Sequence, residues 1–137
     1  MGSPIVADGD EANAAKMNQF VGAPGGKLSV FVKYARIQYN GSAWVVVAGT
    51  DSADIVSGDL AWDGDDDQLE ITLSDFADPP VIVATPTFAA DTVYNVKAIC
   101  SAADTAVIVF YAIDGGAQIT TEATDMDVQV LLIGTYV

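Results

Sequence analysis

Four aspartates within five positions form the densest group of titratable side chains in the chain, in the segment WDGDDDQLEITLSDFADPP from Trp62 to Pro80. They are Asp63, Asp65, Asp66 and Asp67. Carboxylates in such a cluster could bind calcium, which takes several oxygen ligands. The spacing differs from the helix-loop-helix calcium pattern, because Gly64 follows the first aspartate directly and no glutamate stands at the twelfth position. A catalytic pair would need a pocket that shifts one pKa, and four adjacent loop acids indicate solvent instead.

We therefore expect these aspartates to keep a turn hydrated, with no metal, no cofactor and no catalytic residue, and with calcium binding as the alternative. The rest of the chain offers little other chemistry. It contains no histidine and one cysteine, Cys100, so Ser-His-Asp and Cys-His arrangements cannot form and the commonest zinc ligand is missing. An enzyme is not expected.

The charge balance limits the possible partners. The chain has 19 acids against five Lys and Arg, which gives a net charge of −14. Phosphate contacts need Lys and Arg, so nucleic acid is not an expected partner. No apolar run reaches the ~18 residues of a membrane span, so no membrane contact is expected. Asp, a turn residue, outnumbers Glu, a helix former, which indicates many loops and little helix.

The segments that would position the aspartates read as strands. Asn40-Gly41 lies between two β-rich runs and is a strong hairpin signal. Several runs alternate between apolar and polar residues, and their apolar positions should share one face of a sheet. These positions are Leu69, Ile71 and Leu73; Tyr94, Val96, Ala98 and Cys100; and Met126, Val128, Val130 and Leu132.

The run AVIVFYA is continuously apolar and should be a strand covered on both sides. Clusters of Gly, Asp, Ser and Thr separate the runs at short intervals. At 137 residues with 51% hydrophobic residues, this pattern predicts one all-β domain, an antiparallel β-sandwich of eight or nine strands.

The first part of the chain differs from the rest. Residues 1–26 read as an N-terminal arm and hinge, with a brief helix in DGDEANAAKMNQFVG, and residues 27–137 form the β-sandwich domain. About ten residues are too few to hold a helix in water, so this helix must dock on the body or on a partner. Met17, Phe20 and Val21 are the apolar side chains available for that contact.

The order of the later segments resembles an H-type-lectin-like module. The resemblance covers roughly residues 55–137 through LAWDGDDDQLEITLSDFADPPVIVATP, VYNVKAICSAADTAVIVFYA and DVQVLLIGTYV. It implies a six-stranded antiparallel sandwich that assembles as a homotrimer. Earlier in the chain, DGDEANAAKMNQF and ARIQYNGSAWVVVAG resemble segments of structural proteins of tailed viruses, of the bacteriophage or archaeal type.

Together these resemblances imply a structural virion protein, which we expect to be a capsid decoration (cement) protein on the capsid surface that binds the major capsid protein or other virion subunits. The alternative is a fibre tip or lectin-like receptor-binding domain that contacts host-surface glycans. Trp44 and Trp62 are expected in the core or at a subunit contact. The candidate partner contacts are Met17, Phe20, Val21, Trp44 and Tyr136.

Overall fold

A computed structural model describes residues 30–52, 54–87, 94–124 and 126–137. These residues form eight strands and one short 3-10 helix, η1 (Ser57–Asp59). The strands are β1 (Val30–Tyr39), β2 (Trp44–Val46), β3 (Leu60–Asp63), β4 (Gln68–Thr72), β5 (Val81–Pro86), β6 (Tyr94–Ala102), β7 (Thr105–Ala112) and β8 (Asp127–Thr135).

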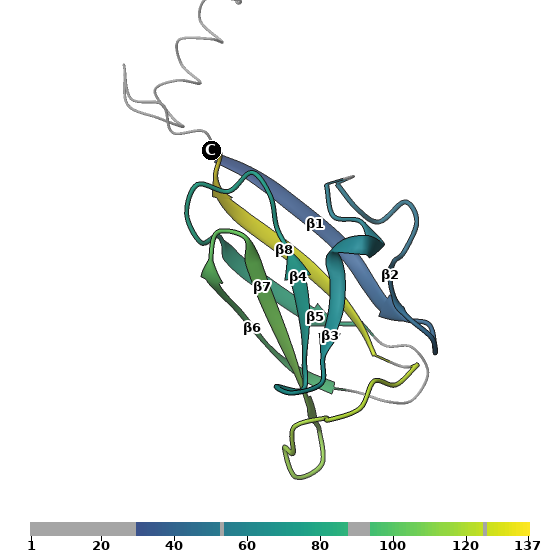
Figure 1. Cartoon of the computed structure of the whole chain (residues 1–137). Coiled ribbons are helices and arrows are strands. Elements are labelled where there is room, and N and C mark those ends of the chain that lie inside the picture. Colours follow the sequence, from purple (N-terminus) through teal and green to yellow (C-terminus); the bar gives the residue numbers. More distant parts are fainter. Residues whose placement is uncertain (1–29, 53, 88–93, 125) are drawn as a thin grey trace, which may run out of the picture.

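The strands pack as two four-stranded antiparallel sheets, ordered β2-β1-β8-β5 and β3-β4-β7-β6. The predicted all-β sandwich is therefore confirmed. Figure 1 shows the two sheets lying over each other, with the C-terminus at the end of the sandwich where β1 begins. The helix expected within residues 1–26 lies outside the described residues.

The predicted hairpin around Asn40-Gly41 is present between β1 and β2. Tyr39 pairs with Trp44 and Ile37 with Val46. The Asn40 side-chain oxygen accepts hydrogen bonds from the backbone N–H groups of Ser42 and Ala43, both at 2.9 Å. Gly41 has φ +96°, a left-handed value that glycine adopts at little cost, so the Asn-Gly pair allows this loop to close.

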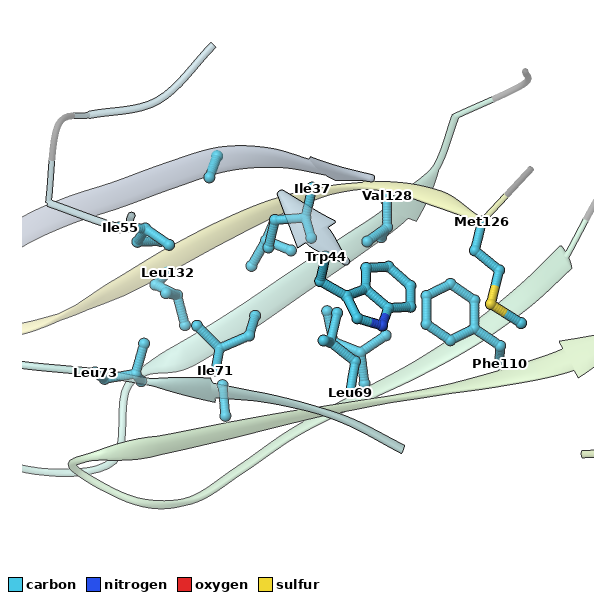
Figure 2. Close-up of a cluster of buried hydrophobic side chains, with 14 of the residues drawn as sticks. Ile37, Trp44, Ile55, Leu69, Ile71, Leu73, Phe110, Met126, Val128 and Leu132 are labelled. Atoms are coloured by element: carbon cyan, nitrogen blue, oxygen red, sulfur yellow. The ribbon is translucent and has the colours of Figure 1, made fainter. Parts of the chain in front are cut away.

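The core lies between the sheets, and the alternating runs supply it as predicted. Leu69, Ile71 and Leu73 face inward from β4 and its end, and Phe110 faces them from β7. Figure 2 shows Trp44 beside Phe110, and their ring centroids are 5.7 Å apart. The buried hydrophobic residues are Ala35, Ile37, Trp44, Ile55, Leu69, Ile71, Leu73, Phe76, Tyr94, Ala106, Ile108, Phe110, Met126, Val128, Val130 and Leu132.

Strand β7, which contains the run AVIVFYA, was expected to be covered on both sides, and the structure shows this for one side. Ala106, Ile108 and Phe110 are fully buried, whereas Val107 and Val109 on the other side of the strand are only half-buried. The second side is shielded by neighbouring strands β4 and β6 rather than by a further layer of described residues. In the part of the chain that the structure describes, no helix has the length and apolarity needed to cross a membrane.

Candidate functional site: the outer face of the β2-β1-β8-β5 sheet

The outer face of the first sheet carries apolar side chains where a two-layer sandwich normally presents polar ones to water. The cross-strand register places them in rows. One row contains Val32, Ile133 and Val81, and the next contains Tyr34, Leu131 and Val83. Val30, one step further along β1, extends the surface.

We call this surface the apolar face. All of its members are between 36% and 65% exposed, although large apolar side chains rarely gather in this way on a soluble surface. The apolar face consists of Val30, Val32, Tyr34, Val81, Val83, Leu131 and Ile133. In Figure 1 its three strands, β1, β8 and β5, form one side of the sandwich.

The face arises because its strands have apolar residues at consecutive positions. In a strand, neighbouring side chains point to opposite sides, so an alternating run gives one apolar face and a continuous run gives two. Strand β8 reads VLLIG and β5 begins VIV, so inward Leu132 and Ile82 are flanked by outward apolar residues. Both runs are visible in the sequence, whereas the pairing of their strands is not.

A charged pair borders the apolar face and leaves it electrically neutral. Arg36 Nε donates to Asp127 Oδ1 at 3.0 Å, and its Nη2 donates to Oδ2 at 2.5 Å. The Thr87 hydroxyl donates to Oδ1 as well, at 2.5 Å. Asp127 is fully buried beneath these partners, and its hydrogen bonds and charge raise the pKa of Arg36. Asp127 is the single carboxylate on the outward side of β1, β8 and β5, and Arg36 neutralises it.

A groove of about 380 Å³ runs across the border between the apolar rows and this charged pair. Tyr34 and Arg36 line it from β1, and Val83 and Thr85 line it from β5, while Gln129 and Leu131 form part of its lining from β8 between them. The groove thus combines an aromatic ring and aliphatic groups with hydrogen-bonding side chains, which is the composition of sites that bind small molecules or inserted side chains.

The outer face of the second sheet is different. Its outward positions include Glu70 and Lys97 among polar residues. Ile99, on β6, is the one large apolar side chain of its described strands that is exposed. Val107 and Val109 of β7 also point outward but are half-buried, so the exposed large apolar side chains of the strands gather on the first sheet.

The aspartates of the opening question lie in the turn that joins β3 to β4, where Trp62 pairs with Leu69. Asp65 donates its backbone N–H to the Asp63 carboxylate at 2.9 Å, and Asp67 has φ +54°. The Gln118 side-chain amide donates to the backbone carbonyls of Asp66 and Asp67. No three acids or thiols among the described residues converge as metal ligands.

The predicted contact residues lie in different environments. Trp44 is 5% exposed; it stacks on Trp62 with ring centroids 6.1 Å apart, and its Nε1 donates to Glu122 at 2.9 Å. It therefore packs within the subunit. Tyr136 is 57% exposed and makes an edge contact with Phe31 at the end of the sandwich. Met17, Phe20 and Val21 lie outside the described residues.

Comparison with known proteins adds no relative to these observations: no family model, no curated protein and no solved structure matches the chain. The functional assignment therefore depends on the chemistry and geometry of the apolar face and on the resemblance of the sequence segments.

Proposed function

We propose that this protein is a structural subunit of a larger particle, and specifically a capsid decoration protein that stabilises a viral head. The observation that carries the structural role is the neutral apolar face on an otherwise acidic chain of net charge −14. Exposed apolar surface costs solubility and is retained where a partner buries it. A structural subunit, which functions by binding its neighbours, can bury such a surface in the contact.

The resemblance to tailed-virus structural proteins and to a trimeric lectin-like module supports the more specific role. In this proposal the chain assembles as a homotrimer on the capsid surface and contacts the major capsid protein. Residues 1–24, with Met17, Phe20 and Val21, make the attachment contact, and the acidic sandwich faces outward. Binding to the assembled capsid and not to its dissociated subunits would stabilise the particle by mass action.

The test uses purified full-length protein and virus particles prepared without it. We expect saturable attachment at a fixed number of copies per capsid, visible by electron microscopy, and an increase in the temperature at which the particles rupture. A full-length Met17→Ser/Phe20→Ser variant should attach at least about tenfold more weakly, because aromatic and long apolar anchors carry much of a contact energy. Full occupancy by this variant would remove the N-terminal contact from the proposal, and no attachment by the unaltered protein would rule out decoration.

The groove favours a second candidate, a fibre-tip or lectin-like domain that binds host-surface glycans. Tyr34 offers a ring face and Arg36, Thr85 and Gln129 offer hydrogen-bonding groups, a combination suited to a sugar ring. Glycan-array binding by the full-length protein, lost in Tyr34→Ala and kept in Tyr111→Ala, would favour this candidate, because Tyr111 lies on β7 of the other sheet and does not line the groove. No binding at millimolar saccharide would exclude it.

A further inference from the structure

We infer that the apolar face is covered by the corresponding face of a second copy of this chain. The inference rests on the proposed structural role and names the partner of that same surface. About a twofold axis one face covers the other directly, whereas about a threefold axis each face divides its area between two neighbours, as the expected homotrimer would require. Charge, shape and area each support a second copy as the occupant.

The distribution of charge limits how two copies can approach each other. Each chain carries a net charge of −14, so most orientations bring carboxylates together and are repulsive. Along the described outward side of β1, β8 and β5, the single carboxylate is Asp127, which is buried and paired with Arg36. Contact through the apolar face therefore avoids the repulsion that the rest of the acidic surface imposes.

A partner of another chemistry would use a different surface. A basic protein would be attracted to the exposed carboxylates of the β3–β4 turn, at Asp65 and Asp66, and not to a neutral apolar sheet. The surface that complements the apolar face is itself apolar and neutral. Every other copy of the chain in solution carries such a surface.

The face combines projecting side chains with a groove. The row of Val32, Ile133 and Val81 lies next to the row of Tyr34, Leu131 and Val83, and the second row borders the groove. The projecting side chains of one copy can enter the groove of another, as in the packing of two sheets face to face at about 10 Å. Tyr34, which is half exposed at the groove, is the side chain best placed to act as an anchor.

The area is large enough for the centre of an interface. The nine residues of β8 span about 30 Å, and three adjacent strands are about 15 Å wide, so the apolar rows and the groove beside them together cover roughly 450 Å². This is about half of the ~800 Å² that each partner buries in a standard interface. The contact therefore needs flanking residues as well as the apolar face.

The experiment measures the mass of the full-length protein in solution by sedimentation equilibrium at micromolar concentration. We expect a dimer or a trimer for the unaltered chain. Val83→Asp and Leu131→Asp should each weaken self-association at least about tenfold, because each places a carboxylate in a neutral apolar contact. Ile99→Asp is the matched control: it alters an exposed isoleucine on the outer face of the other sheet and should leave the mass unchanged. Circular dichroism melting curves establish that each variant is folded.

Salt distinguishes this contact from an ionic one. Raising NaCl from about 50 mM to about 500 mM shortens the range of the repulsion between copies, so self-association should become tighter, whereas an interface held by ion pairs would weaken. A monomer at every salt concentration would overturn the inference, as would an oligomer unaffected by Val83→Asp and Leu131→Asp.

The two proposals fail separately. If the chain is a monomer but attaches to capsids, the second copy and the homotrimer are wrong and decoration stands. If the chain self-associates through this face but no particle binds it, decoration is wrong and the second copy stands.

Discussion

At the scale of single residues, the least expected feature is a lysine in the core. Lys33 lies on the inward side of β1 and is 1% exposed. Its ammonium group donates to Ser74 Oγ at 3.1 Å and to Asp75 Oδ2 at 3.3 Å, and it lies 5.8 Å from the ring centroid of Phe31 and 5.7 Å from that of Phe76. A buried charge needs such partners, because removing an ion from water costs several kcal/mol.

Removing the carboxylate should therefore cost more than removing the lysine charge. Asp75→Asn leaves the buried ammonium without its counter-ion, and we expect a loss of about 1–2 kcal/mol in the free energy of unfolding, reduced by the half exposure of Asp75. Lys33→Met fills the same space without a charge and should change stability by less than about 1 kcal/mol. Urea denaturation measures both, with the exposed Asp78→Asn as control. Equal losses in the two variants would mean that each loses only the ion pair, and that the ammonium left in Asp75→Asn carries no burial penalty.

Cys100 gives a pH-dependent prediction. Partial burial raises the pKa of its thiol, because desolvation disfavours the thiolate. The stability that comes from keeping the thiol neutral is fully present below the pKa of the unfolded chain, about 8.5, and is lost as the pH rises through the higher folded pKa. Between pH 7.5 and 9.5 the free energy of unfolding should fall more steeply for the unaltered protein than for Cys100→Ala. Parallel curves would contradict this linkage.

At the scale of elements, strand β8 contains a glycine that the packing requires. A Cβ at Gly134 would lie 2.6 Å from Phe76 Cδ1 and 3.1 Å from Pro80 Cβ. Phe76 is buried and stacks on Phe31 with ring centroids 4.5 Å apart, so it cannot move aside freely. The strand comes close to the segment before β5 because residue 134 has no side chain.

Gly134→Ala should therefore destabilise the fold by about 1–3 kcal/mol, the usual cost of an overpacked core. The matched control is Gly64→Ala in the β3–β4 turn, where a Cβ would have no atom within 4 Å and the backbone is not left-handed. It should be neutral within about 0.5 kcal/mol. A thermal melt of both variants is sufficient, and similar melting temperatures would show that Phe76 relaxes.

Sequence pattern predicts the elements of this fold better than it predicts what covers them. Alternation in Leu69–Leu73 and in Met126–Leu132 identifies strands and their inward faces correctly, because one apolar face of a strand must be buried. Alternation does not say whether Trp44 faces the core or a partner, since both environments accept tryptophan. It also does not show that Lys33 points inward, because its counter-ion Asp75 lies 42 residues away in the sequence. Such contacts are set by tertiary packing.

The apolar face could be predicted from the sequence only in part. Continuous apolar runs such as VLLI are visible in the sequence, and they predict strands with two apolar faces. The alignment of these runs into rows across β1, β8 and β5 depends on strand order and register, which the sequence does not give directly. An exposed apolar residue on one strand forms part of a surface only together with its neighbours on the adjacent strands.

At the scale of the whole molecule, acidic side chains far outnumber basic ones, and most of the described basic side chains are paired internally. Two of the three cationic side chains in the described residues, Lys33 and Arg36, are committed to internal pairs with Asp75 and Asp127. Lys97 is the third. The remaining described surface is therefore dominated by carboxylates, which repel one another in the folded state more than in the expanded unfolded chain.

Screening that repulsion should stabilise the protein. We expect the melting temperature to rise by several degrees between about 20 mM and 1 M NaCl, because the Debye length falls to about 3 Å at 1 M. Calcium at micromolar concentration should add nothing beyond its ionic strength, and a chelator should leave the melting temperature unchanged, since the aspartates of the β3–β4 turn do not converge on a common point. Asp65→Asn/Asp66→Asn should raise the melting temperature slightly at low salt and respond less to NaCl. A saturable rise with micromolar calcium that this double variant abolishes would instead make the turn a calcium site.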